Sequence, residues 1–300
     1  MIDTKLETLI MVYETNSFTK AAELLSLTQP AVSQHIRQLE RELGATLFLR
    51  GDGSLKLTEE GAIAVKYAKR IKSLYQNMEQ ALSDESRHIT RLSVGITHTA
   101  ESNIMVEILA RYSNSHPGCR ITIISDGINN LYHKLKTYEI DLAIIEGKIV
   151  DDNYNSVMLD TDSLILAVSP DNPLSNKSIV TLDELKKEKL ILRLPDSATR
   201  NLFISHLESN NVSLDEFNVT LEVDNVATIK DLVRRNFGVS VLAKSVFASE
   251  MRKGKIAGLP IENLSMTREI NMMYHKDFKH SQILQDITRI YYEYSKSRYE

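Results

Sequence analysis

The chain has 300 residues and a mass of 34.0 kDa, which corresponds to about two domains because one domain commonly holds ~100–200 residues. Hydrophobic residues make up 42% of the chain and charged residues 25%, proportions that exclude a disordered or fibrous protein. The net charge of −4 argues against a protein that binds nucleic acid through bulk positive charge.

The sequence also restricts the compartment. Its single cysteine, Cys119, excludes an intrachain disulfide and a cysteine-based metal cluster, and such sparse use of cysteine is typical of a reducing compartment. Residues 1–5 lack the basic-then-apolar pattern of a signal peptide, and the sequence has no apolar run of the ~18 residues that a membrane span needs. We therefore expect a cytoplasmic protein with no membrane partner.

Residues 17–43 predict two short helices joined by a tight turn. Ser17 and Thr28 are expected to cap the two helices, with the turn at Ser26-Leu27 between them. The apolar residues of the second helix share one face that should pack inward: Val32, Ile36, Leu39 and Leu43. The opposite face carries Gln29, Pro30, Ser33, Gln34 and Arg37. Because Gln, Ser and Arg can hydrogen-bond base edges or phosphates, the pattern predicts a helix-turn-helix; a small helical bundle with an ordinary polar face is the alternative.

Two short β-patterned runs follow, Leu47–Arg50 and Leu55–Thr58, on either side of a glycine-containing turn. They predict a β-hairpin wing from which Arg50 could reach phosphate or the minor groove, with a solvated surface arginine as the alternative. Residues 1–58 hold six Lys or Arg and seven Asp or Glu. DNA binding by this region would therefore depend on a few well-placed Lys and Arg side chains, and a dimer would present twice as many of them to the DNA.

Residues 59–88 predict one long helix. Thr58 should cap its start, and Glu59 and Glu60 suit the positive end of the helix dipole. Apolar residues recur at heptad spacing: Ala64, Ala68, Ile71, Tyr75, Met78 and Leu82. This is the spacing with which two helices pack along a seam. We predict a helix that pairs with a second copy of the chain; an amphipathic helix on the core of its own domain is the alternative.

From Arg91 onward, short β-rich runs alternate with helical stretches, which predicts an α/β region. The β-rich runs are Leu92–Ile96, Ile121–Ile124, Leu142–Ile145, Leu164–Val168, Leu190–Leu194, Val219–Val223 and Val239–Leu242, and the helical stretches are 102–114, 128–138, 199–209 and 226–236. This order predicts a parallel sheet with right-handed crossovers, duplicated into two lobes with a cleft between them. A strand at Glu269–Tyr274 and a helix at Ile283–Tyr294 should complete the first lobe.

The N-terminal pattern resembles that of the LysR-type transcriptional regulators. The residues that carry the resemblance are Phe18-Thr19-Lys20-Ala21-Ala22, Leu24-Leu25, Thr28-Gln29-Pro30-Ala31-Val32-Ser33, Ile36, Leu39-Glu40, Leu43-Gly44, Leu47-Phe48, Arg50 and Leu57-Thr58. The motif extends over some forty positions, and the resemblance continues along the whole chain.

This resemblance implies a fold that is α/β overall and has three parts. They are a winged helix-turn-helix DNA-binding domain (1–58), a dimerising linker helix (59–90) and a two-lobed effector domain similar to periplasmic binding proteins (91–300). Lobe I would comprise about 91–161 and 267–300, and lobe II about 162–266. The family also implies a homodimer through 59–88, a homotetramer built from two such dimers, and double-stranded DNA as partner; it leaves RNA polymerase open as a further partner.

Carried over by position, the family's DNA contacts fall on Gln29, Pro30, Ser33, Gln34 and Arg37, with Arg50 at the wing. Many relatives have a second arginine three residues after the wing arginine, where this chain has Gly53. We therefore expect a weaker wing contact, with Lys56 as a partial substitute.

The resemblance further implies a small-molecule co-inducer of unknown identity between the lobes, and no other cofactor. Thr97 and Thr99 follow the first strand of the α/β region, and Ser197 and Thr199 occupy the equivalent place in its second half. Hydroxyls beside free helix N–H groups suit an anion, although plain N-capping is an equal alternative. Ser197-Ala198-Thr199-Arg200 resembles the Ser-Gly-Thr-Arg stretch of many relatives, and Arg200 would pair either with an anionic effector or with a structural carboxylate.

Glu146 closes the third strand of the first lobe. If it faces the cleft, it would repel a purely anionic ligand and attract an amine or a guanidinium, so the charge class of the effector stays open; a surface carboxylate is the alternative. Asp224-Asn225 is expected to cap a helix, and Cys119 to be structural.

Catalytic and metal sites find no support in the sequence. It contains no phosphate-binding glycine loop, no Gly-x-Ser-x-Gly and no His-Glu-x-x-His, and its eight histidines never recur at i, i+3 or i, i+4. We therefore predict a sequence-specific DNA-binding regulator without catalytic residues. The alternatives from other classes are a solute-binding protein on the same two-lobed scaffold and a metabolic enzyme whose N-terminal helices serve only to dimerise.

Overall fold

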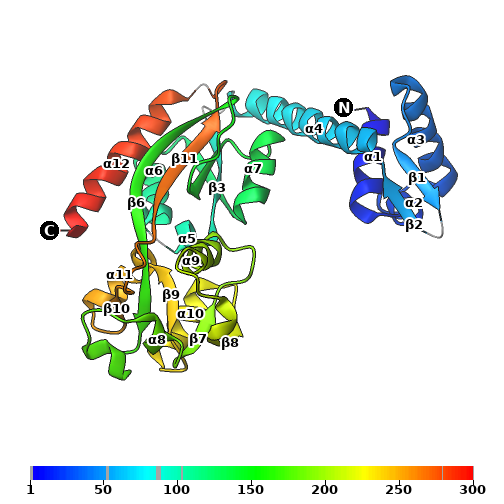
Figure 1. Ribbon diagram of the computed structural model, residues 1–300. Helices are drawn as coiled ribbons and strands as arrows, with labels where there is room; N and C mark the ends of the chain where they lie inside the picture. Colours follow the sequence, from blue (N-terminus) through cyan, green and yellow to red (C-terminus); the bar gives the residue numbers. More distant parts are fainter. Residues whose placement is uncertain (1–2, 52–53, 86–88, 103, 279, 300) are drawn as a thin grey trace. The chain divides into compact units, whose positions relative to one another are not determined.

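A computed structural model describes residues 3–51, 54–85, 89–102, 104–278 and 280–299 (Figure 1). The chain separates into two compact units, one of residues 1–90 with 133–139 and one of residues 91–132 with 140–300. None of the helices in the described ranges has the length and apolar character that crossing a membrane requires.

The first unit contains the helix-turn-helix and its wing. Its elements are α1 (Thr4–Thr15), α2 (Phe18–Leu24), α3 (Gln29–Leu43), β1 (Phe48–Gly51), β2 (Ser54–Leu57) and α4 (Glu59–Glu85). Ser17 caps α2 by accepting the Lys20 N–H, and Thr28 caps α3 by accepting the Ala31 N–H, which confirms both predicted caps. The strands β1 and β2 pair antiparallel, so the predicted hairpin is also present.

The inward face of α3 packs against α1, α2 and the wing. Val32, Ile36 and Leu39 are buried in a core that also contains Leu9 of α1 and Phe48 of β1. The prediction that Leu43 shares this face was wrong, because its side chain is 53% exposed. Leu43 is the last residue of α3, directly before the left-handed Gly44, and at that point the helix has passed the end of the core.

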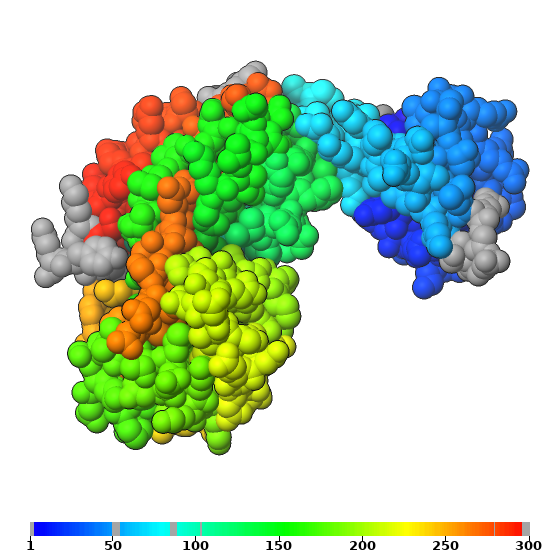
Figure 2. Space-filling model, in the orientation of Figure 1, coloured from blue at the N-terminus to red at the C-terminus, as the bar shows by residue number. Residues whose placement is uncertain are grey.

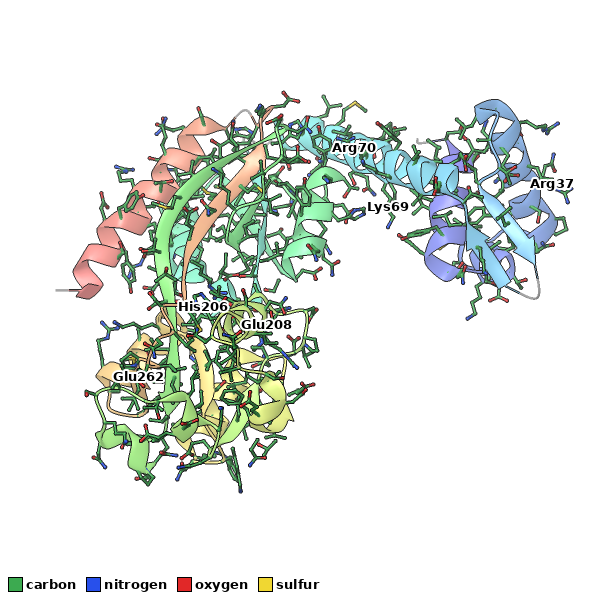
Figure 3. The ribbon with its side chains drawn as sticks, viewed as in Figure 1. Arg37, Lys69, Arg70, His206, Glu208 and Glu262 are labelled. Carbon is green, nitrogen blue, oxygen red and sulfur yellow. The ribbon has the colours of Figure 1, made fainter. Side chains whose placement is uncertain are left out.

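The long helix α4 has a buried apolar face in its first half and an exposed apolar stripe along most of its length. Thr58 caps it by accepting the Gly61 N–H at 2.8 Å. In the first half, Val65 and Ala68 are buried in the core of the first unit, so the predicted seam was wrong at Ala68, which faces its own domain. An exposed apolar stripe runs instead along Ile63, Tyr67, Ile71, Leu74, Met78 and Leu82; we call it the α4 stripe. Lys69, labelled in Figure 3, pairs with Glu14 of α1 at 3.2 Å and helps to fix the helix.

Gly61 marks a close approach between α4 and the wing. A Cβ atom at this position would overlap the Leu47 carbonyl oxygen and come within 2.8 Å of Leu57 Cδ1. We expect Gly61→Ala to lower the free energy of unfolding by about 1–3 kcal/mol, the usual cost of overpacking, measured by urea unfolding with circular dichroism. Gly127→Ala is the control, since a Cβ there meets nothing within 4 Å. An unchanged stability of Gly61→Ala would contradict the close approach.

The α/β region of two lobes follows; it is the second unit together with Thr90 and residues 133–139, which belong to the first unit. Its elements in chain order are β3 (Thr90–Ile96), α5 (His98–Glu101), α6 (Met105–Ser115), β4 (Cys119–Ser125), α7 (Ile128–Lys136), β5 (Leu142–Glu146), β6 (Tyr154–Val168), η1 (Pro173–Asn176), α8 (Leu182–Leu185), β7 (Lys189–Leu192), α9 (Ala198–Ser209), η2 (Leu214–Glu216), β8 (Asn218–Glu222), α10 (Val226–Arg234), β9 (Ser240–Ala243), α11 (Lys244–Arg252), β10 (Ala257–Leu259), β11 (Thr267–His275) and α12 (Ser281–Tyr299). One core joins β3, β5 and the middle of β11 to α6 and α12, and we call this part lobe I. A second core, made of residues between Leu164 and Met266, defines lobe II. The yellow surface of lobe II adjoins the green surface of lobe I in Figure 2.

One long strand, β6, is paired in both lobes. The 15-residue strand β6 pairs antiparallel with β11 along its first part, up to Ser163 opposite Thr267. From Leu164 onward it pairs with β9 and β10 in lobe II. The prediction of a parallel sheet was therefore incomplete: β3 with β5 and β7 with β8 are parallel, but every pairing of β6 is antiparallel. Figure 1 shows β6 and β11 side by side in lobe I, from which β6 continues into lobe II.

Candidate DNA-binding face and interlobe cavity

The outward face of α3 presents polar side chains to solvent. Gln29, Pro30, Gln34 and Arg37 are all exposed, as predicted, and Figure 3 labels Arg37 on this helix. Pro30, Gln34 and Arg37 line a surface groove together with Arg41 and the turn after α3. The helix begins with its capped N-terminus on this face, which is the end that leads into the major groove in helix-turn-helix proteins.

Ser33 does not lie on the open face. Its side chain is only 7% exposed, and its hydroxyl accepts a hydrogen bond from Gln29 Nε2 at 3.0 Å. The expectation that Ser33 is presented directly to solvent was wrong, because the residue lies at the border between the packed and the open face. In this position Ser33 orients the amide of Gln29.

The wing residues are only partly described. Arg50 occupies β1 opposite Leu55 of β2, but its side chain and Gly53 lie outside the described part of the chain. Lys56 on β2 is exposed, so it presents one cation beside the hairpin turn.

A cavity of about 250 Å³ lies between the lobes; we call it the interlobe cavity. It is lined by residues that follow strands of both lobes, namely Thr97, His98, Thr99, Asp126, Gly127, Ile128, Glu146, Arg193, Leu194, Asp196, Ser197, Ala198 and Asp224. Four residues predicted for the effector site line it: Thr97, Thr99, Ser197 and Glu146. Strand ends are where α/β sheets collect polar groups, which explains the convergence.

Thr97 and Glu146, two of the candidates of lobe I, are hydrogen-bonded to each other. The Thr97 hydroxyl accepts the Ala100 N–H at 3.1 Å and donates to Glu146 Oε1 at 2.7 Å. Thr97 is thus an N-cap, the alternative reading of this residue, and at the same time the partner of a buried carboxylate. The hydroxyls of Thr99 and Thr199 lie 3.5 Å apart, so they bring lobe I and lobe II into contact at the edge of the cavity, although Thr199 does not line it.

The predicted residues of lobe II separate into two kinds. Ser197 precedes α9, but its side chain makes no capping hydrogen bond, so its hydroxyl is available to the cavity. Arg200 lies outside the cavity lining, and its Nη1 donates to Glu222 Oε1 at 2.6 Å and to the Arg193 carbonyl at 3.0 Å. Of the two roles considered for Arg200, the structure shows the pairing with a structural carboxylate.

Sequence reasoning missed four charged residues of the cavity: Asp126, Arg193, Asp196 and Asp224, the last of which it interpreted as part of a helix cap. Arg193 is almost fully buried and pairs with Asp224 at 3.1 Å, while Asn225 caps α10 as expected. Asp126 and Arg193 directly follow β4 and β7, the kind of position from which Thr97 was chosen, but the predicted strands ended at Ile124 and Leu194 and so concealed this signal. Cys119 lies buried at the start of β4, and burial raises the pKa of its thiol above the usual value, as befits a structural cysteine.

Comparison with known proteins identifies the class. Residues 4–62 match a family described as "Bacterial regulatory helix-turn-helix protein, lysR family", and residues 86–293 match the "LysR substrate binding domain". The chain belongs to the LysR family of transcription regulators. This confirms the predicted family, the fold class and the function of a DNA-binding regulator, and it identifies a regulator instead of an enzyme.

The individual relatives are distant. A "Probable RuBisCO transcriptional regulator" of Thalassiosira pseudonana is 28% identical over 270 residues, with 87% of each chain covered. The regulator CysL of Bacillus subtilis is 25% identical, covering 90% of this chain and 89% of CysL. Among solved structures, the LysR-family regulator CbnR has a TM-score of 0.68 at 20% identity and covers 98% of this chain and 99% of its own. At that identity the likeness to CbnR shows the fold alone.

Proposed function

We propose that this regulator binds a specific DNA site with α3 and that a small molecule in the interlobe cavity controls this binding. The exposed groups of Gln29, Gln34 and Arg37 would contact bases and phosphates in the major groove, with Ser33 holding Gln29 and with Pro30 at the helix start. Arg50 would reach the DNA backbone from the wing. The observation that carries the proposal is the presence in one chain of a capped, polar-faced α3 and a cavity lined by both lobes.

We further propose a homodimer that forms through the α4 stripe. Six large side chains of one helix expose an apolar surface to water, and a second copy would cover them at low cost because both helices are already ordered. A structure of CbnR bound to its target DNA is among the structural relatives, which supports DNA as a partner of this chain.

A homotetramer and a contact with RNA polymerase stay predictions from the family resemblance.

The cavity couples to DNA binding only if the effector prefers one arrangement of the lobes. A ligand that contacts Thr97 and Ser197 at once touches both lobes, so its affinity depends on their separation. Such differential binding is the physical condition for a switch.

DNA binding is tested first with the DNA upstream of the protein's own gene. Fluorescence anisotropy should show tight binding to this fragment, weaker binding to scrambled DNA, and loss of affinity as salt rises. Equally weak binding to both fragments, repeated with a genome-wide library of fragments, would contradict a sequence-specific regulator.

The effector cavity is tested by filling it. We expect Ser197→Phe to keep DNA affinity but to abolish both the rise in Tm and the change in DNA affinity that a metabolite panel produces in wild type. Ser205→Phe is the matched control, because Ser205 lies exposed on the same helix and outside the cavity lining. A metabolite response that survives in Ser197→Phe would place the effector elsewhere.

A further inference from the structure

Glu146 is a carboxylate that the protein buries without a cation. It closes β5, lines the interlobe cavity and is 6% exposed. Its recorded hydrogen bond is to the neutral hydroxyl of Thr97, and no lysine, arginine or histidine among the described residues lies within ion-pair distance. Burial of a carboxylate without a neighbouring cation is unfavourable when the group is ionised, so this arrangement favours a ligand that supplies positive charge.

The other charged groups of the cavity do not supply it. Among the described lining residues, Arg193 is the one lysine or arginine, and it is already paired with Asp224 at 3.1 Å. Asp126 and Asp196 add two further carboxylates to the lining. The cavity therefore has an excess of negative charge, and its potential attracts cations.

The nearest arginine in the sheet register does not neutralise Glu146 either. Glu146 lies opposite Ile270 on the neighbouring strand β11, and Arg268 is two residues from Ile270. The guanidinium nitrogens of Arg268 are buried and make no hydrogen bond, and no ion pair joins Arg268 to Glu146. Arg268 thus forms no ion pair with Glu146, whose carboxylate has the Thr97 hydroxyl as its hydrogen-bond partner.

We propose that the effector carries a primary ammonium or a guanidinium group and that Glu146 binds this group. The charge-assisted hydrogen bond to Glu146 supplies the specificity, and the hydroxyls of Thr97 and Ser197 accept or donate to the polar remainder of the ligand. This inference rests on the proposed function, since it assumes that the effector occupies the interlobe cavity.

The test compares cationic with anionic probes on the full-length chain. Putrescine, agmatine and L-lysine are titrated by isothermal calorimetry at constant ionic strength, with glutarate and succinate as anionic probes of similar size. The variant Glu146→Gln keeps an oxygen that accepts the Thr97 hydroxyl but removes the charge. Glu208→Gln is the matched control, because Glu208 is exposed on α9 (Figure 3) and outside the cavity lining.

We expect at least one cationic probe to bind wild type and Glu208→Gln equally and to bind Glu146→Gln about 10- to 100-fold more weakly, the range for a hydrogen bond to a charged group. The inference is overturned if no cationic probe binds wild type, or if Glu146→Gln binds it as tightly. Binding of glutarate that Ser197→Phe abolishes would keep the cavity as the effector site and reject a cationic effector. Cationic binding that persists in Ser197→Phe would reject the cavity itself.

Discussion

A negative charge at Ile71 should produce a folded chain that sediments with half the mass of wild type and binds its DNA site at least 100-fold more weakly. Ile71 lies near the middle of the α4 stripe and is 46% exposed. In the proposed dimer each copy of Ile71→Glu would bury an unpaired carboxylate against the other helix, which costs several kcal/mol. Two linked recognition helices gain about 10²–10⁴ in avidity over one, and the monomer loses this gain.

Sedimentation equilibrium and anisotropy on the same samples check this prediction. Ile179→Glu is the control, since Ile179 in lobe II is 45% exposed and lies far along the chain from α4. The same chemical change at the same exposure should there leave both mass and DNA affinity unchanged. A full-mass Ile71→Glu would show that the α4 stripe is not the contact between copies.

Replacement of Gln34 by alanine should relax sequence preference more than it weakens binding overall. Gln34 is exposed on the outward face of α3, in the second turn after its capped end, and a glutamine amide that reads a base edge contributes about 1–3 kcal/mol of discrimination. We therefore expect the ratio between the affinities for the preferred site and for single-base variants to fall by roughly 5- to 150-fold at one or two base positions.

Competition binding against a library of single-base variants of the site measures this ratio. Gln38→Ala provides the control on the same helix, because Gln38 is equally exposed but bonds to Glu42 one turn further on. It should leave discrimination intact. Unchanged discrimination in Gln34→Ala would remove Gln34 from the base-reading face.

Local signals in the sequence were sufficient for most elements of the fold. Capping residues such as Ser17, Thr28 and Thr58 act on their own helix, so their effect can be predicted from adjacent residues. The first half of β6 and its pairing with β11 were missed, because Tyr154–Ser163 mixes charged and apolar residues without clean alternation. Its partner is more than one hundred residues away, and no local pattern encodes such a pairing.

The α4 stripe shows a second limit of periodicity. Heptad spacing selected Ala64 and Ala68 together with Ile71, but spacing cannot tell whether a helix face meets its own domain or another chain. Val65 and Ala68 are small enough to pack under the first unit, while the larger Ile63 and Tyr67 stay outside. The size of the side chains on each face of α4 would have indicated which face packs against the helix's own domain.

For the cavity, strand-end reasoning found Thr97, Thr99, Ser197 and Glu146. It could not decide between an anionic effector and a structural carboxylate as the partner of Arg200. Its partner Glu222 belongs to β8, which lies beside β7 in the sheet, and this neighbour relation becomes visible only in three dimensions. The burial of Glu146 could not be predicted from the sequence either, since the residues that line the cavity with it come from distant parts of the chain.

The strand pairing of β6 also constrains how the lobes can move. Its ladder passes from β11 at Ser163 to β9 at Leu164 without an unpaired residue, so β6 itself has no unpaired joint at which the lobes could separate freely. Separation of the lobes must instead bend or twist β6 while its hydrogen bonds to the neighbouring strands stay intact. This requirement opposes large displacements of one lobe relative to the other. The conformational entropy of β6 is therefore lost when the chain folds and not when the effector binds. An effector of only a few non-hydrogen atoms then needs to change the angle between the lobes only slightly.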